Sequence, residues 1–311
     1  MKLGMVFPGQ GSQSVGMLKG YGGLPEVDAV RAEAALALGD GFLQILDQGP
    51  AEQLNLTVNT QPAMVTVAIA AYRAWRALGG PEPEIVAGHS LGEYSALVAA
   101  GSLALRDALP LVRFRAQSMQ EAVPEGQGAM AAILGLDEDA ARAACDDAAQ
   151  GEVVQAVNFN APGQVVIAGH KSAVARAIEA CKARGAKRAM PLPVSAPFHS
   201  SLMQPAAAKL GKFMQGVAFS EPRIPVLNNV DVAQEKDPVK IKDALVRQAA
   251  SPVRWVETIR AMAAQGVTHV VECGPGKVLA GLVKRIDPQV QGLAAADRAS
   301  LELALAAIRG G

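Results

Sequence analysis

The sequence has few residues of the two types that most often carry redox and metal chemistry, with three cysteines and four histidines among 311 residues. The cysteines, at positions 145, 181 and 273, form no C-x-x-C pair, and their number is odd. This pattern argues against a disulfide framework and a zinc site, and it favours a reducing compartment. Any histidine-dependent chemistry must use one of four candidates, namely His89, His170, His199 and His269.

The chain also lacks net charge, because 29 Lys and Arg residues balance 29 Asp and Glu residues. This balance argues against a general nucleic-acid binder, although a local basic patch can still face an acidic partner. Half of the residues (50%) are hydrophobic and 19% are charged, which is the composition of a globular protein. At this length we expect one large domain that carries a smaller one.

Long hydrophobic runs are absent as well. The longest, 63–72, has about half of the roughly 20 residues that a membrane span needs, and it follows Thr60-Gln61-Pro62, a plausible start for a buried helix. Residues 1–7 run into Pro8-Gly9 after one short apolar stretch, which is not the pattern of a signal peptide. We therefore expect a cytoplasmic protein with no membrane attachment.

Short apolar runs mark the predicted strands. Residues 3–7 form one, and residues 84–87 form another that is followed by a sharp turn and a helical segment. Strand, turn and helix in that order are typical of a parallel α/β sheet. Between Gly128 and Val194 the pattern changes to strand, helix, strand, strand, helix, strand, with strand predictions at 129–134, 153–157, 165–168 and 188–192 and helix predictions at 137–149 and 171–184. This βαββαβ order predicts a ferredoxin-like small domain inserted into the larger one.

The segment Gly88-His89-Ser90-Leu91-Gly92 has the G-x-S-x-G pattern of a nucleophile elbow, and it lies between a predicted strand and a predicted helix. Such a turn lifts the serine Oγ to the carboxyl end of the sheet, beside the positive N-terminus of the next helix. The backbone N–H of Leu91 would then point at a developing oxyanion. The alternative is an ordinary turn in which Ser90 caps the helix, but the placement favours a nucleophile.

A nucleophilic serine needs a general base. His89 is the neighbour of Ser90 on the turn and is expected to project away from it. His170 lies at a helix entry and His269 inside a predicted strand, where structural roles are expected. His199 alone lies in an irregular segment at the junction of the two predicted domains, where clefts form. We therefore predict His199 as the base.

No aspartate is placed to complete a triad. In the hydrolase order the acid lies between the serine and the histidine, but none of the aspartates there ends a sheet strand; they are Asp107, Asp137, Asp139, Asp146 and Asp147. A backbone carbonyl at a helix C-terminus can orient His199 instead. Gln248 suits that role because it lies in the last turn of the predicted helix 240–250, on its apolar side. The alternative is a surface glutamine.

Arg115 is placed against the polarity of its helix. At roughly 100° per residue, the predicted helix 103–122 has one polar face, made of Arg106, Pro110, Arg113, Gln117 and Gln120. Arg115 lies near the centre of the opposite face, with Ala108, Leu111, Val112, Ser118 and Met119. A guanidinium directed at the core needs a carboxylate partner. That partner is either an internal Asp or Glu or a carboxylate of the substrate.

The glycine-containing loop 7–13 follows the first predicted strand but does not match a dinucleotide fingerprint, because Ser14 stands where a third glycine is required. No P-loop lysine pattern is present either. The N–H groups around Gln10 can instead reach the site as a second oxyanion donor. Near the C-terminus, Pro275 makes the turn after Cys273 a poor cysteine elbow, so Cys273 is predicted to be buried packing.

Together these residues resemble the malonyl-CoA:acyl-carrier-protein transacylases of bacterial fatty acid synthesis. The matching motifs occur in family order over nearly the whole chain: FPGQGSQ (7–13), TQPA (60–63), GHSLGEYSAL (88–97), NFNAPGQVVIAGH (158–170), FH (198–199), ALVRQ (244–248) and GPGKVL (274–279). The resemblance implies an α/β fold with an α/β-hydrolase-like large domain, containing the parallel sheet, over 1–125 and 196–311. The inserted ferredoxin-like (βαββαβ) small domain would cover 126–195.

The resemblance also implies a role for each matching residue. Ser90 resembles the acylated nucleophile, His199 the base, and Gln248 the residue whose main-chain carbonyl holds that base. Arg115 resembles the residue that pairs with the malonyl carboxylate. The remaining matches are Gln10 and Leu91, whose amides resemble the oxyanion hole, and Phe198, whose bulk resembles that of malonyl-selective members and would disfavour an α-methyl group.

The implied reaction is a ping-pong transfer of malonyl from coenzyme A to Ser90 and then to the phosphopantetheine thiol of acyl carrier protein. The expected partners are malonyl-CoA and acyl carrier protein, with no nucleic acid, membrane, metal or bound cofactor, and we expect a monomer. A thioesterase or esterase of the same fold and an inactive carrier-binding module remain alternatives. The acceptor could serve fatty acid, polyketide or malonate-decarboxylating machinery.

A candidate docking patch for an acidic carrier is Lys182, Arg184, Lys187 and Arg188, for which a solvated helix end is the simpler interpretation.

Overall fold

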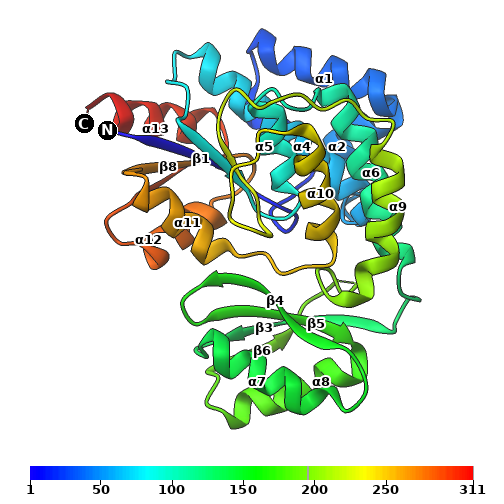
Figure 1. Cartoon of the computed structure of the whole chain (residues 1–311). Helices are drawn as coiled ribbons and strands as arrows, with labels where there is room; N and C mark the ends of the chain where they lie inside the picture. The colour runs from blue at the N-terminus through cyan, green and yellow to red at the C-terminus, as the bar shows by residue number, and fades with distance from the viewer. Residues whose placement is uncertain (195, 311) are drawn as a thin grey trace.

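The computed structural model describes residues 1–194 and 196–310 (Figure 1). It is a mixed α/β protein with a parallel sheet and an antiparallel sheet, each packed against helices. The parallel sheet and most helices form the upper part of Figure 1, and the antiparallel sheet with two helices forms the lower part. The predicted boundary at residue 195 lies outside the described residues. None of the helices in the described ranges combines the length and the apolar character that a membrane span requires.

The parallel sheet has the strand order β7-β2-β1-β8-β9. Alternate residues of β1 pack on opposite faces, because Met5 and Phe7 belong to one apolar cluster and Val6 to another. Burial on both faces explains the continuous apolar run that predicts this strand. Phe7 lies opposite Gly88, so the loops after β1 and β2 leave the sheet at the same edge. The strands are β1 (Leu3–Phe7), β2 (Ile85–Gly88), β7 (Val226–Leu227), β8 (His269–Cys273) and β9 (Gln291–Ala295).

The helices of this larger part surround the parallel sheet. In chain order they are η1 (Met17–Tyr21), α1 (Pro25–Leu38), α2 (Asp40–Gln48), α3 (Ala51–Leu54), α4 (Thr57–Ala77), α5 (Gly92–Ala99), α6 (Leu105–Glu121), η2 (Ser201–Met203), α9 (Gln204–Met214), α10 (Pro238–Ala249), α11 (Trp255–Ala264), α12 (Val278–Ile286) and α13 (Arg298–Gly310).

Helix α4 begins earlier than the sequence predicts. The triplet 60–62 predicts a helix start, but α4 begins at Thr57 and contains Pro62. Pro62 has no N–H for the carbonyl four residues earlier, so one intrahelical bond is lost near the helix start. The burial of every residue from 60 to 71 offsets that loss. The predicted start is therefore wrong by about one turn.

The antiparallel sheet has the order β4-β5-β3-β6, and its elements follow one another as βαββαβ, which confirms the predicted element order. The N-cap side chain of Asp137 accepts a hydrogen bond from Ala140 N at 2.8 Å. The strand predicted to end at 157 continues to Ala161, because the segment keeps pairing with β5 through two register shifts. The elements are β3 (Gly128–Leu134), α7 (Glu138–Ala149), β4 (Val154–Ala161), β5 (Gln164–His170), α8 (Lys171–Ala183) and β6 (Arg188–Pro191).

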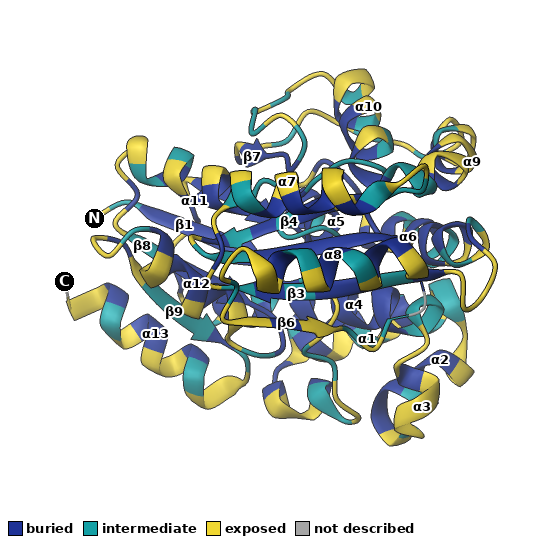
Figure 2. Ribbon diagram, turned by 90° about the horizontal axis from the view of Figure 1, so that it is seen from below, coloured by how far each residue is buried: buried dark blue, intermediate teal, exposed yellow. Residues whose placement is uncertain are grey.

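Buried residues lie between the sheets and their helices, whereas α7, α8 and α13 turn exposed faces outward (Figure 2). The antiparallel sheet and its two helices share an apolar cluster that is separate from those of the parallel sheet. The three cysteines are free and buried in these clusters. Cys273 therefore packs in the core, as predicted.

Glu272, on β8, is a carboxyl group enclosed by the core. Its side chain is fully buried, Oε2 accepts a hydrogen bond from Ala280 N at 2.8 Å, and Oε1 has no partner among the described residues. Burial raises the pKa of Glu272 from 4.5 to about 7. The folded protein thus keeps the Glu272 carboxyl group protonated at pH values where the unfolded chain has lost that proton. The stability that this protonated group contributes is therefore lost as the pH rises toward 7.

Replacing Glu272 with Gln is expected to flatten the pH dependence of stability. Between pH 5 and pH 8 the wild-type free energy of unfolding should fall by up to about 3 kcal/mol more than that of Glu272→Gln. Urea unfolding of both proteins at the two pH values measures the difference. An equal change in the two proteins would show that Glu272 does not titrate in this range.

Candidate active site

The turn between β2 and α5 holds Ser90 in the left-handed region, with φ of 52°. Two glycines make this turn possible. A Cβ at Gly88 would lie 1.8 Å from the carbonyl carbon of Gly92, and a Cβ at Gly92 would lie 2.0 Å from Phe7 O. No side chain fits at either position, so the sequence pattern G-x-S-x-G follows from the close packing of strand, turn and helix.

The His199 side chain meets Ser90 at this turn. His199 Nε2 lies 2.6 Å from Ser90 Oγ, and His199 Nδ1 lies 2.9 Å from the main-chain oxygen of Gln248. Because a carbonyl oxygen only accepts, Nδ1 carries the hydrogen and Nε2 is left to accept from the serine. Burial, and then the charge of Arg115, lower the pKa of His199 from 6.5 to about 3. The imidazole is therefore neutral near pH 7 and able to take a proton.

The guanidinium of Arg115 is the third group at the Ser90 hydroxyl. Its side chain is 2% exposed, and Nη2 lies 3.2 Å from Ser90 Oγ. Nη1 donates to Gln61 Oε1 at 2.8 Å and Nη2 to Gln248 Oε1 at 3.1 Å. Arg115 forms no ion pair within the described residues. A buried cation with only neutral hydrogen-bond partners is suited to receive an external carboxylate.

The side chain of Gln248 lies in the protein interior and is fully buried, so the surface alternative is wrong. Its Nε2 donates to Ser90 O and to Glu93 Oε2, both at 2.9 Å. One residue thus orients His199 through its main chain and contacts Ser90 and Arg115 through its side chain.

Three polar residues of the site, Gln61, Glu93 and Asn229, are not predicted from the sequence. Asn229 is fully buried, accepts from Ser90 N through Oδ1 and donates to Gly88 O through Nδ2, both at 2.7 Å. Gln61 and Glu93 belong to the quoted motifs TQPA and GHSLGEYSAL, which was the available signal. Asn229 follows a strand of only two residues and had no such signal.

A chain of hydrogen bonds connects Arg115 to the loop after β1. Gln61 accepts from Arg115, and its Nε2 donates to Thr57 Oγ1 at 3.1 Å. Thr57 Oγ1 in turn donates to Gln10 Oε1 at 3.0 Å. The loop that carries Gln10 is therefore tied through α4 to the guanidinium.

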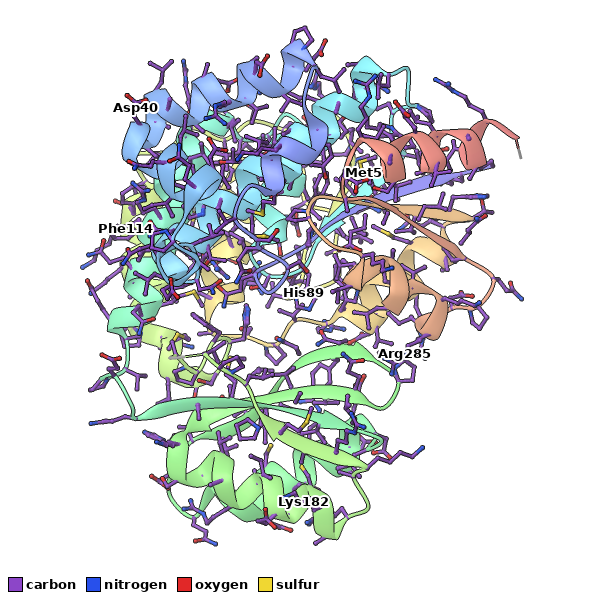
Figure 3. All side chains as sticks on the ribbon, turned by 180° about the vertical axis from the view of Figure 1, so that it is seen from behind. Met5, Asp40, His89, Phe114, Lys182 and Arg285 are labelled. Carbon is purple, nitrogen blue, oxygen red and sulfur yellow. The ribbon has the colours of Figure 1, made fainter. Side chains whose placement is uncertain are left out.

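These groups line a cavity of about 140 Å³ between the two parts of the molecule. Figure 3 shows the labelled His89 where the upper part meets the antiparallel sheet. All predicted site residues line this cavity except Gln248, which supports it from the interior. The lining residues are Gly9, Gln10, Gln61, His89, Ser90, Leu91, Arg115, Met130, Asn158, Leu192, Val194, Phe198 and His199.

The other three histidines make contacts away from the Ser90 hydroxyl. His89 Nε2 lies 2.7 Å from Asn160 Oδ1, and its ring packs against Trp255 with centroids 5.3 Å apart. His170 Nδ1 accepts from Val153 N at 2.9 Å at the start of α8. His269 begins β8 and contacts its neighbour Thr268. None of these contacts reaches Ser90 Oγ.

The candidate basic patch on the small sheet is partly neutralised. Lys182 pairs with Glu179 at 2.8 Å, and Arg184 pairs with Asp147. These pairs favour the interpretation of a solvated helix end.

Known proteins with related sequences and structures cover nearly the whole chain. The acyl transferase domain family matches residues 5–301. Malonyl CoA-acyl carrier protein transacylase of Escherichia coli (strain K12) is 58% identical over 282 residues, which are 90% of this chain and 91% of that protein. The protein of the same name from Bacillus subtilis (strain 168) is 44% identical over 310 residues, which are 99% and 98% of the two chains.

Solved structures agree with this relationship. An acyl-carrier-protein S-malonyltransferase from Burkholderia pseudomallei is 61% identical, with a TM-score of 0.96 over 98% of this chain and 100% of that one. A malonyl-transacylase complex with a type II polyketide acyl-carrier protein contains a chain that is 51% identical, with a TM-score of 0.96 over 99% of this chain and 100% of that one. With Ser90, His199 and Arg115 assembled around one cavity, this chain belongs to the malonyl-CoA:acyl-carrier-protein transacylase family of acyltransferases.

Proposed function

We propose that the protein transfers a malonyl group from coenzyme A to the phosphopantetheine thiol of acyl carrier protein, and so supplies malonyl-carrier for fatty acid chain elongation. This proposal rests on one observation: His199 Nε2 and Arg115 Nη2 both contact the same hydroxyl, Ser90 Oγ. A base and an unpaired cation at a single nucleophile suit an acyl group that ends in a carboxylate.

The first half-reaction loads the serine. His199 takes the proton of Ser90 as Oγ attacks the malonyl thioester carbonyl, while Arg115 binds the distal carboxylate of the malonyl group. The oxyanion of the tetrahedral intermediate is stabilised by the amides of Gln10 and Leu91, a role supported by their place in the lining of the same cavity. When the intermediate collapses, the C–S bond breaks and coenzyme A leaves as its thiol, protonated by His199.

The second half-reaction reverses these steps with a different thiol. His199 takes the proton of the phosphopantetheine thiol, whose sulfur attacks the malonyl-Ser90 ester, and Ser90 Oγ leaves with that proton. The carbonyl of Gln248 keeps the imidazole in one tautomer through both halves, as its 2.9 Å contact supports. Phe198 lines the cavity and is 7% exposed, which supports a role in excluding an α-methyl group.

The names of the relatives support the choice of substrates. They include malonyl CoA-acyl carrier protein transacylases and a complex of one such enzyme with a carrier protein. We further propose that the enzyme is monomeric and cytoplasmic, that it needs no metal or bound cofactor, and that it binds neither nucleic acid nor membranes. The free cysteines are consistent with that location.

The proposal extends to the domain description. Residues 1–125 and 196–311 would form the α/β-hydrolase-like domain, supported by a serine at the carboxyl end of a parallel strand. Residues 126–195 would form the ferredoxin-like domain, supported by the βαββαβ order and a separate apolar cluster.

Intact-mass spectrometry tests this function directly. Mixing the protein with malonyl-CoA should add one malonyl group, and carrier protein with its phosphopantetheine arm should remove that group much faster than water does. Faster discharge by water would identify a thioesterase or esterase instead. The absence of any adduct would identify a carrier-binding module without transferase activity.

A further inference from the structure

The carboxylate of Glu93 lies next to the site but outside the cavity. Glu93 lies in the first turn of α5, shortly after Ser90 in the chain. It is 2% exposed and is not among the residues that line the cavity. Its Oε2 accepts two hydrogen bonds, from Gln248 Nε2 at 2.9 Å and from Asn229 N at 3.0 Å. A buried carboxylate with these contacts does not touch substrate, so any effect on the reaction must pass through its two donors.

Both donors hold the main chain of the nucleophile. Asn229 Oδ1 accepts from Ser90 N at 2.7 Å, and Gln248 Nε2 donates to Ser90 O at 2.9 Å. The two peptide groups that flank Ser90, which has a positive φ, are therefore held by two residues that Glu93 contacts in turn, through the main-chain N–H of Asn229 and the side chain of Gln248.

The contacts of Glu93 also determine which way round the Gln248 amide lies. The two hydrogens of Nε2 are directed to Glu93 Oε2 and Ser90 O. Glu93 Oε2 already accepts from Asn229 N, which identifies it as an acceptor, and a carbonyl oxygen only accepts, so the amide oxygen must face the other side. That side is Arg115, whose Nη2 donates to Gln248 Oε1 at 3.1 Å. A reversed amide would place an NH₂ group against the guanidinium and an oxygen against two acceptors.

We infer that Glu93 is a positioning residue for malonyl selectivity: its carboxylate fixes the orientation of the Gln248 amide, and that amide holds the Arg115 guanidinium beside Ser90. The inference rests on the proposed function, in which Arg115 binds the malonyl carboxylate. An acetyl group has no such carboxylate. Misplacement of Arg115 therefore penalises malonyl loading more than acetyl loading.

The variant Glu93→Gln tests the inference with almost no change in shape. The glutamine oxygen can still accept from Asn229 N, but a neutral amide holds the Gln248 amide more weakly than a carboxylate does, so the orientation is enforced less strongly. Loading of Ser90 from malonyl-CoA and from acetyl-CoA is followed by quenched intact-mass spectrometry. The ratio of malonyl to acetyl loading rates is expected to fall about 10-fold, the size associated with one hydrogen bond to a charged group. A merely structural role lowers both rates equally, and an unchanged ratio overturns the inference.

Glu272→Gln is the matched control, because Glu272 is also a fully buried carboxyl group but contacts the start of α12. The ratio of malonyl to acetyl loading rates in Glu272→Gln should equal that of the wild type.

The wild-type protein distinguishes failure of the proposed function from failure of this inference. A wild type that forms no malonyl ester overturns both. A wild type that prefers malonyl, with the ratio unchanged in Glu93→Gln, overturns the inference alone.

A second variant, Gln248→Met, keeps the main-chain carbonyl that contacts His199 and removes the amide that contacts Arg115. It should lower the ratio at least as far as Glu93→Gln, and the double variant should lower it no further, because Glu93 acts through Gln248. If the reductions of the ratio in the two single variants multiply in the double variant, the inference is overturned. If Glu93→Gln does not fold, an unchanged ratio in Gln248→Met overturns it, because Glu93 then has nothing to act through.

Discussion

The Ser90→Ala variant is expected to form no covalent adduct with malonyl-CoA and to lose at least about 10⁴-fold in malonyl transfer. The reason is that Ser90 Oγ is the hydroxyl on which His199 Nε2 and Arg115 Nη2 converge, at 2.6 and 3.2 Å. Alanine keeps the turn, since it adds nothing to the crowded contacts around Gly88 and Gly92, but it removes the atom that attacks the thioester. Intact-mass spectrometry and a carrier-transfer assay measure the two losses.

Ser102→Ala is a suitable control for this experiment. Ser102 is also a buried serine, but its Oγ donates to Ser220 O at 2.7 Å, away from the cavity. This variant should load malonyl at the wild-type rate. An adduct of the same mass and rate on Ser90→Ala would show that another residue is the nucleophile.

The Arg115→Ala variant should lose about 10² to 10³-fold in malonyl loading, as expected when one partner of a buried charge pair is removed. Its rate of loading from acetyl-CoA should rise relative to its rate from malonyl-CoA, because the cavity then holds no buried cation that needs a carboxylate partner. The truncation also leaves Gln61 Oε1 and Gln248 Oε1 without the donor they now share. Loading rates with malonyl-CoA and acetyl-CoA, compared on the same preparation, measure the change in preference.

Arg113→Ala provides the matched control on the same helix. Its guanidinium lies 5.5 Å from the ring centroid of Phe42, on the other face of α6, and does not line the cavity. Its ratio of malonyl to acetyl loading should equal that of the wild type. Equal losses of both activities in Arg115→Ala would mean that Arg115 supports the fold of the site and does not bind the malonyl carboxylate.

Local patterns were sufficient for several parts of the site. The glycines around Ser90 predict a tight turn because a side chain on either one would collide with backbone. The helical period separates Arg115 from the exposed face that carries Arg106 and Gln117, and the structure confirms that Arg115 is buried. The sequence predicts structural roles for His170 and His269 and a direction away from Ser90 for His89. His199 is then left as the base, and the structure places it against Ser90.

Elements with weak local patterns were harder to predict. Strand β7 has two residues and β9 reads Gln-Gly-Leu-Ala-Ala, so neither has the apolar run that marks β1. The start of α4 was wrong because burial of the helix outweighs the proline that it contains. Tertiary packing decides such cases, since local preferences of about 1 to 3 kcal/mol are smaller than the burial of a whole helix face.

The sequence by itself determined which residue types meet local geometric requirements: the nucleophile turn, the inward direction of Arg115, and the βαββαβ order of the inserted segment. Only the tertiary structure decided how those pieces combine. Ser90 and His199 are 109 residues apart in the chain, and Ser90 and Gln248 are 158 apart. Hydrogen bonds between such distant residues depend on the packing of strands and helices that no local period encodes. This is why the contacts of Glu93 and Asn229, which hold the nucleophile in place, emerge only in the folded protein.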